Sequence, residues 1–300
     1  SSQGGVSDKD TAQAFMQSTL ADAARVSGVV AGLKLNEMIE DGTITEDNCK
    51  MGYVGAFPYA EVISGYTSFY LGAKSVCPSV TMEVKYTNSW ASFDLEKECA
   101  DALISDGCVL ISQHADTTGA PTACEAAGVP CVGYNIDMTS VAPNTALTSA
   151  SMDWGVYYTY AVQCMLDGTA IDTDWCKGFS DGADKITPLN ENVVAEGTDE
   201  KVKEVEDALA DGSLHVFDTS TFTVDGKELT TYKKDGSDTE YVSDGYFHES
   251  EYGSAPAFDV AIDGIILLLE LFVSMYVCVR KKTGDIHLAL AAGTLYLFSY

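Results

Sequence analysis

Residues 108–138, CVLISQHADTTGAPTACEAAGVPCVGYNIDM, decide the fold class that the sequence predicts. Residues 108–112 form an apolar run, which is typical of a strand covered on both faces. A helix is expected next, because Pro121 suits a first turn, Gly128 suits a left-handed C-terminal cap and Pro130 prevents continuation. Residues 131–134 are a second apolar run. The stretch therefore predicts a βαβ unit.

Polar residues follow each of the two predicted strands, at 113–117 and 135–138. In a βαβ unit both of these loops lie at the carboxyl edge of one parallel sheet. Open α/β sheets bind their ligands at that edge. The pattern therefore predicts a ligand pocket beside these two loops.

The preceding sequence extends the same alternation. Residues 13–35 are rich in small apolar residues and predict a closely packed helix, and 51–57 predict a strand with a helix after it. Residues 82–86 alternate as a half-buried strand does, and Ser92 can cap the helix that follows. Residues 51–138 thus predict four strands alternating with three helices, which is one parallel, doubly wound α/β lobe.

The predicted carboxyl-edge loops contribute aromatic rings and short polar side chains. This mixture suits a flat small molecule that stacks on rings and forms hydrogen bonds. The residues concerned are Phe57, Asn88, Ser89, Trp90, His114, Asp116, Asn135 and Asp137.

The second half of the chain is less regular. Helices are expected at 153–166 and 199–210, and 215–231 predicts a β-hairpin around Asp225-Gly226. Residues 232–256 are expected to form a loop. Residues 265–279 are apolar, but about 15 residues is short for a transmembrane helix, so a buried element is favoured slightly over a membrane span.

Composition excludes several function classes. A net charge of −28 argues against nucleic acid and anionic membrane surfaces as partners. The chain has no phosphate-binding glycine loop and no hydrolase or metalloprotease motif, so neither a metal nor a cofactor is expected. Acid–base catalysis by His114 and Asp116 is a minor alternative, and Asp137 lacks the partners of a metal site. Buried cysteines such as Cys99, Cys108, Cys124 and Cys131 are expected to act as small apolar residues.

Several ordered segments resemble the BMP (basic membrane protein) family. These segments are KMGYVGAFPYAEVISGYTSFYLGAKSVCP, YTNSW, SQHADTTGAP, VGYNIDM, APNTALTS, MDWGVYY and DGYFHESEYGSAPAFDVAIDGI, and the resemblance runs from about residue 20 to 265. It implies a type I periplasmic-binding fold, in which two α/β lobes close on a ligand. It also implies an extracytoplasmic, membrane-anchored lipoprotein, on the cell surface or periplasmic, that captures a solute for the permease of an ABC importer.

The resemblance further implies a purine nucleoside or nucleobase as ligand and no catalysis. No nucleic acid partner is expected, and the protein is expected to be a monomer. The ligand-binding residues that the resemblance implies are Phe57, Trp90, His114, Asp116, Asn135, Asp137 and Trp154, with Asp181 a weaker candidate. Asn88 is added to these candidates from its place in the carboxyl-edge loop. A membrane-tethered sensor that uses the same fold is the alternative function.

The resemblance also suggests a division of the chain. Residues 1–48 are expected to be a remnant of the first lobe, which is otherwise largely missing, and 49–150 the second α/β lobe. Residues 151–264 are expected to hold a hinge-crossing helix, the remaining second-lobe elements and the hairpin. Residues 265–300 form an atypical apolar tail. Because the chain begins without Met, residue 1 is not expected to be the start of the gene product.

Overall fold

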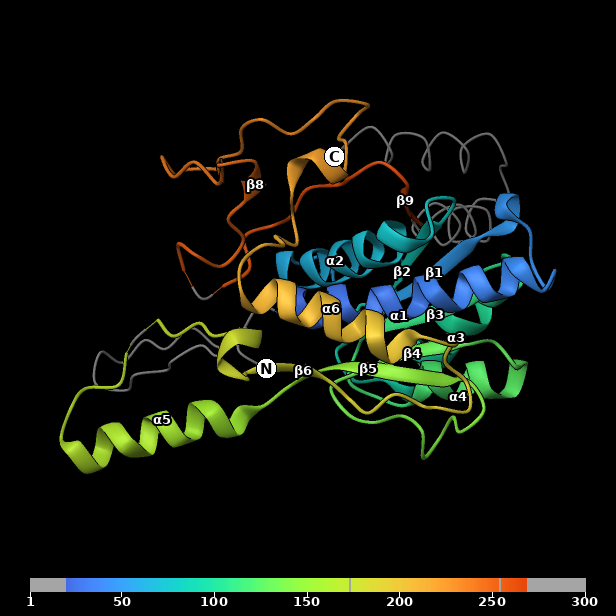
Figure 1. Cartoon of the computed structure of the whole chain (residues 1–300), viewed down its shortest axis with the longest axis horizontal. Coiled ribbons are helices and arrows are strands. Elements are labelled where there is room, and N and C mark those ends of the chain that lie inside the picture. Colours follow the sequence, from blue (N-terminus) through green and yellow to red (C-terminus); the bar gives the residue numbers. More distant parts are fainter. Residues whose placement is uncertain (1–19, 173, 254, 269–300) are drawn as a thin grey trace, which may run out of the picture. The chain divides into compact units, whose positions relative to one another are not determined.

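The computed structural model describes residues 20–172, 174–253 and 255–268 (Figure 1). The chain divides into two compact units, one ending at Ile265 and the other beginning at Ile266. The first unit contains the elements described below, apart from β9, of which only Ile265 belongs to it.

The first unit alternates helices and strands, as the sequence predicts. Its α-helices are α1 (Leu20–Glu40), α2 (Ala60–Val76), α3 (Phe93–Ser105), α4 (Gly119–Ala127), α5 (Trp154–Asp167) and α6 (Thr198–Ala210). The strands are β1 (Lys50–Gly55), β2 (Thr81–Tyr86), β3 (Leu110–His114), β4 (Cys131–Tyr134), β5 (Ala146–Met152), β6 (Asp184–Ile186), β7 (Val242–Ser243), β8 (Tyr246–Phe247) and β9 (Ile265–Leu267). Short 3-10 turns are η1 (Glu46–Asn48), η2 (Phe179–Asp181) and η3 (Thr219–Thr221).

The central sheet has the order β6-β5-β4-β3-β1-β2, with the short β9 following at the β2 edge where the first unit ends. Strands β1 to β5 pair in parallel, and β6 joins β5 antiparallel. Tyr53 in β1 stands opposite Val84 of β2 and Ser112 of β3. The order 2-1-3-4-5 is that of an open doubly wound sheet, so the direction in which successive strands are added reverses between β1 and β3.

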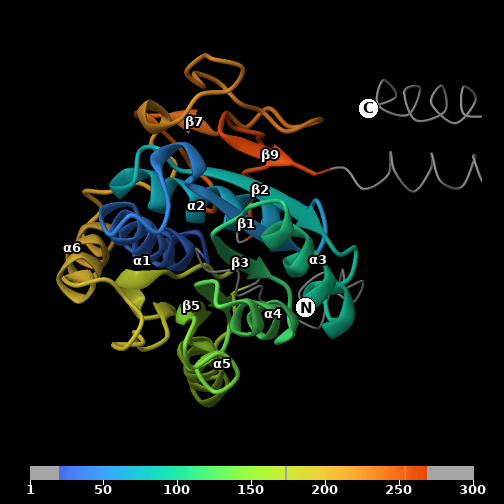
Figure 2. The same ribbon diagram turned by 90° about the vertical axis from the view of Figure 1, so that its right-hand side faces the viewer.

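Helices cover both faces of this sheet. Figure 2 shows α1 and α2 on one side and α3 and α4 on the other. Fully buried Met51, Leu110 and Leu147 contribute to the core between the sheet and its helices. Burial on both faces explains the apolar runs at residues 51–54, 108–111 and 131–134.

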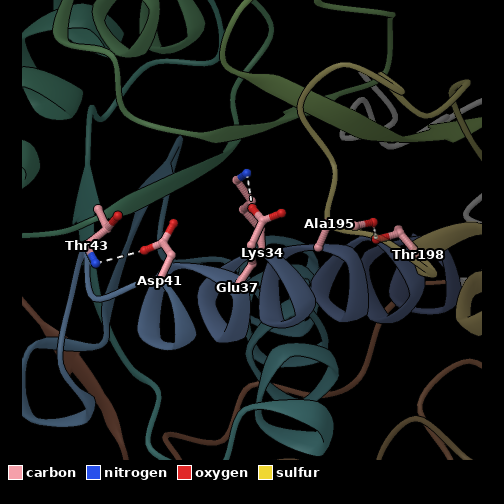
Figure 3. A network of polar contacts seen from close by, with 6 residues as sticks. All are labelled: Lys34, Glu37, Asp41, Thr43, Ala195 and Thr198. Carbon is pink, nitrogen blue, oxygen red and sulfur yellow. Dashed lines mark hydrogen bonds and ion pairs between the residues drawn. The ribbon is translucent and has the colours of Figure 1, made fainter.

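The end of α1 is fixed by short-range polar contacts. Lys34 pairs with Glu37, and the Asp41 carboxylate accepts a hydrogen bond from the Thr43 N–H at 2.8 Å (Figure 3). Hydrogen bonding with the Thr43 side chain, and then with its N–H, lowers the pKa of Asp41. At the start of α6, which packs beside α1, the Thr198 hydroxyl donates to the Ala195 carbonyl at 2.7 Å.

The predicted βαβ units are confirmed. The four predicted strands correspond to β1 to β4, and Gly128 caps α4 with a left-handed φ of 69°. Ser92 is the N-cap of α3, but the stabilising contact runs from the Ser92 N–H to the Glu96 carboxylate at 3.2 Å. The first described residue of α1 is Leu20, so the predicted helical residues 13–19 lie outside the described part of the chain.

The predicted hairpin around Asp225-Gly226 is wrong in its strands and right in its turn. Both turn residues have positive φ, and a single bridge joins Val224 to Lys227. The flanking residues pair with other segments instead: Phe247 N–H donates to the Phe217 carbonyl at 3.0 Å, and Asp263 N–H donates to the Thr223 carbonyl at 2.8 Å.

Four of the described strands were not predicted. Strands β5 and β6 lie in segments for which the sequence predicted no strand, and the β7–β8 hairpin lies inside the predicted loop 232–256. Most of the apolar run 265–279 lies outside the described residues. Within the described part of the chain, no helix is long and apolar enough to cross a membrane.

Candidate functional site

The candidate site lies where β1, β2, β3 and β4 end. Phe57 follows β1, Asn88 and Trp90 follow β2, Asp116 follows β3, and Asn135 follows β4. Because the sheet order reverses between β1 and β3, this edge is the topological switch point at which open α/β sheets leave a crevice.

Five rings from these strand ends form a continuous group, here called the edge cluster: Phe57, Tyr59, Trp90, His114 and Tyr134. The rings of Phe57 and Tyr59 stack at 5.2 Å with an interplanar angle of 17°, and Trp90 lies 5.5 Å from Phe57. Trp90 is 6.5 Å from His114, whose ring is 4.6 Å from Tyr134. The outer end of the edge cluster is open, because Tyr59 is 43% exposed.

His114 is the most unusual member of the edge cluster. The prediction placed it in a polar loop, but it is the last residue of β3 and is fully buried. Among the described residues neither ring nitrogen has a hydrogen-bond partner, and Gly65 of α2 leaves room for Nδ1. Burial lowers the pKa of His114 to about 4. The imidazole is therefore neutral at pH 7 and has one donor and one acceptor nitrogen.

The loop after β3 is tied to the edge cluster. The Asp116 N–H donates to the Trp90 carbonyl at 2.8 Å, and the Thr117 hydroxyl donates to the buried Glu96 carboxylate at 2.6 Å. The Asp116 side chain is exposed, yet partial desolvation raises the pKa of its carboxyl group. These contacts fix the loop while leaving the Asp116 carboxylate available.

Two asparagines and an aspartate complete the polar side of the edge. Asn88 and Asn135 are exposed and have φ of 55° and 68°, a conformation that asparagine tolerates better than most residues. The Asn135 backbone is held on both sides, since its N–H donates to Ala150 and its carbonyl accepts from Ser151, each at 2.7 Å. Asp137 is exposed and accepts a hydrogen bond from the Thr139 N–H at 2.8 Å.

Two predicted residues lie apart from the edge cluster. Trp154 begins α5, which points away from the sheet (Figure 1), and its described ring neighbour is Tyr158 at 6.4 Å. Asp181 pairs with Lys177 at 3.1 Å and lines a different cavity of about 460 Å³ beside Tyr246. Of the nine predicted residues, these two are therefore not brought into contact with the edge cluster within the described chain.

Two rings of the edge cluster were not among the predicted site residues. Tyr59 is the N-cap of α2, two residues beyond Phe57, and Tyr134 is the last residue of β4. Their position at a strand's carboxyl end was the available signal.

The chain resembles curated relatives over a little more than half of its length. It is 34% identical to a purine-binding protein of Brucella abortus over 177 residues, which is 59% of this chain and 50% of that protein. It is 33% identical to a putative ABC transporter glucose-binding protein of Haloferax volcanii over 189 residues, 63% of this chain and 48% of that protein. The chain thus spans about half the length of these relatives.

A solved structure supports the fold. The ABC transporter solute-binding protein of Aeropyrum pernix superposes with a TM-score of 0.56 at 15% identity, covering 66% of this chain and 64% of that one. The expected type I periplasmic-binding fold is therefore confirmed. The family described as ABC transporter substrate-binding protein PnrA-like matches residues 19–213. The chain belongs to this family, the Bmp family of substrate-binding proteins.

Proposed function

We propose that this chain captures a purine nucleoside or nucleobase outside the cytoplasm and delivers it to an ABC importer. The family is the extracytoplasmic, non-catalytic component of such transporters, which binds a small molecule and works with permease subunits. The proposed ligand agrees with the purine-binding protein of Brucella abortus among the relatives. We further propose a monomer held at the membrane by a lipid anchor.

The observation that carries this proposal is the edge cluster. A purine base has two flat faces, and stacking of a base on an aromatic side chain contributes about 1–3 kcal/mol. Tyr59 and Phe57 already stack on each other, and Trp90 stands 6.3 Å from Tyr59 at an angle of 38°. These rings form an aromatic wall with an exposed end, to which a base can add.

The polar groups around the wall match the edges of a nucleoside. The neutral His114 imidazole has a donor and an acceptor nitrogen without partners in the described structure. Because the ring is fully buried against Trp90 and Tyr134, a purine ring nitrogen or carbonyl reaches it only when those rings move apart. The Asp116 carboxylate can accept from base N–H groups or ribose hydroxyls. Asn88 and Asn135 add amides, which both donate and accept.

Binding should be tested on Tyr59→Ala against a matched control, Phe93→Ala. Both rings are exposed to nearly the same extent, 43% and 42%, so both substitutions should cost little stability. Calorimetric titration would compare adenosine, guanosine, adenine and glucose. The wild type should bind a purine, Tyr59→Ala should bind it roughly tenfold more weakly, and Phe93→Ala should bind as the wild type does.

Two results would overturn the proposal. Binding of glucose in preference to every purine would assign the site to sugars, as the name of the Haloferax volcanii relative suggests for that protein. Equal purine affinity in Tyr59→Ala and wild type would remove the edge cluster from the binding site.

A further inference from the structure

Two buried thiols face each other at the amino edge of the sheet, opposite the edge cluster. Cys49 directly precedes β1, and Cys77 follows the last residue of α2. Their Sγ atoms are 3.6 Å apart, and the side chains are 2% and 1% exposed. Residues 28 positions apart in sequence are thus brought into sulfur–sulfur contact.

The backbone holds this pair in place. The Cys49 carbonyl accepts from the Thr81 N–H at 3.0 Å, and the Cys77 carbonyl accepts from the Val80 N–H at 3.2 Å. The Cys77 N–H donates to Ala73 at 2.8 Å as the C-cap of α2. Both cysteines are therefore positioned by β1, β2 and α2 together, so that closing the gap between the sulfur atoms requires only a small side-chain movement.

We propose that Cys49 and Cys77 form a disulfide bond in the extracytoplasmic compartment to which the family belongs. Disulfides persist in such oxidising compartments. The oxidant is a small-molecule or protein disulfide, RSSR, acting by thiol–disulfide exchange.

The exchange proceeds in two steps. The Cys77 thiolate attacks RSSR, forming a mixed disulfide and releasing one RS⁻. Cys49 then loses its proton and attacks the Cys77 sulfur, which releases the second RS⁻. The protein loses two protons and two electrons, and RSSR becomes two RSH.

The electrostatics of the pair favour this order of attack. A hydrogen bond from the Cys49 thiol, assisted by Ser79, lowers the pKa of Cys77 to about 6, and the same contact raises the pKa of Cys49. Cys77 is therefore the attacking sulfur. The exposed Pro78 follows Cys77 directly, so the thiolate lies just beneath the surface.

The bond should be detected by alkylating the whole chain with N-ethylmaleimide in denaturant after purification without reductant, followed by peptide mass spectrometry. Cys108 is the internal control, because its thiol faces the Glu83 carboxylate at 3.8 Å. Alkylation of Cys108 with protection of Cys49 and Cys77, and one cross-linked peptide joining the latter two, is expected.

A melting experiment provides the second readout. Dithiothreitol should lower the melting temperature of the wild type by roughly 10 °C. The double variant Cys49→Ala/Cys77→Ala should melt at the same temperature with and without reductant, and Cys108→Ser should respond as the wild type does.

The proposal would be overturned if Cys49 and Cys77 were alkylated as fully as Cys108 after refolding in a glutathione disulfide buffer. A cross-link from either residue to another cysteine, such as Cys124, would overturn it equally. Neither result depends on which ligand the protein binds.

Discussion

The residue on which most of the binding argument depends is His114. A buried polar group without a hydrogen-bond partner costs about 1–3 kcal/mol, and both nitrogens of this imidazole are unpaired among the described residues. Such a cost is typical of functional sites, where a ligand supplies the missing partner. The residue is therefore expected to favour binding at the expense of stability.

This reasoning predicts the behaviour of His114→Phe, which keeps a ring of similar shape and removes both polar atoms. The unfolding free energy at pH 7 should rise by about 1–2 kcal/mol, measured by urea denaturation. Affinity for the purine should fall about tenfold, because one ligand hydrogen bond is lost. His215→Phe, at an exposed histidine stacked on Tyr246, is the control and should change neither quantity appreciably. A less stable His114→Phe protein would show that the imidazole has a structural partner.

The same residue predicts a pH dependence. Burial lowers the pKa of His114 from 6.5 to about 4, so the folded state binds the proton more weakly than the unfolded state does. The contribution of His114 to the free energy of unfolding is therefore fully present above about pH 6.5. It falls by about 3 kcal/mol in total as the pH falls towards 4. Denaturation midpoints measured from pH 7 to pH 4 should show this loss in the wild type. The His114→Phe variant should lack it, and identical pH profiles for the two proteins would contradict the assignment.

At the scale of elements, the contact between α1 and α2 positions Gly65, and through it the edge cluster. A Cβ atom at Gly28 would stand 2.1 Å from the Phe69 carbonyl oxygen, and one at Gly72 would stand 2.2 Å from the Arg25 carbonyl oxygen. Both neighbours are backbone atoms, which cannot rotate away. The two helices therefore approach as closely as they do only because these positions are glycine.

Gly28→Ala should consequently destabilise the protein, although glycine-to-alanine changes within helices normally stabilise by about 0.5–1 kcal/mol. The expected loss is about 2 kcal/mol or more, the cost of overpacking a buried contact, measured by urea denaturation. Gly155→Ala in the first turn of α5 is the matched control, because a Cβ there would meet only the Asp153 side chain. If both variants had the same stability, the close helix contact would be disproved.

The elements that the sequence predicted are those that local pattern determines. Residues 108–112 and 131–134 are apolar because helices cover both faces of the sheet, and Gly128 and Pro130 mark the end of α4. Strand β6 carries no such pattern, because its three residues pair with β5 from outside the parallel sheet. The hairpin prediction failed because Phe217 and Phe222 pack against Phe258, far along the chain.

The candidate site, like the fold, could be predicted from the sequence only where local pattern determines it. Phe57 ends a predicted strand, and Asn88, Trp90, Asp116 and Asn135 lie in the loops after predicted strands, so topology alone places them at one edge. The burial of His114 was not predictable, since it depends on α2 offering a glycine at position 65. The separation of Trp154 from the edge cluster depends on the direction of α5, which no local pattern encodes.

At the scale of the whole molecule, the decisive quantity is the net charge of −28. Fields of this size extend over about 10 Å at 0.1 M salt and repel anions from the surface. Near the edge cluster, Asp116 and Asp137 are exposed carboxylates. Burial, and after it the charge of the nearby Glu61, raises the pKa of Tyr134. A ligand that approaches this edge therefore meets a negative potential.

This potential predicts discrimination between nucleosides and nucleotides, provided that the proposed purine site is right. Adenosine monophosphate should bind at least tenfold more weakly than adenosine at low salt, since its phosphate adds close to two negative charges. The difference should shrink in 0.5 M sodium chloride, about the range where exposed charges are largely screened, and adenosine affinity should change little. Calorimetric titration at both salt concentrations measures all four affinities.

Asp116→Asn distinguishes the effect of a carboxylate beside the edge cluster from the effect of the net charge of the chain. The substitution removes one carboxylate charge beside the edge cluster and preserves the shape of the side chain. The ratio by which adenosine monophosphate binds more weakly than adenosine should therefore become smaller at low salt. Asp41→Asn removes an exposed carboxylate beyond the end of α1 and so alters the net charge equally. It should leave the affinity ratio between adenosine and adenosine monophosphate nearly unchanged. An equal response to both substitutions would mean that the net charge alone excludes nucleotides. Tighter binding of the monophosphate than of adenosine would mean that the ligand site presents a cation, and would contradict the electrostatic argument itself.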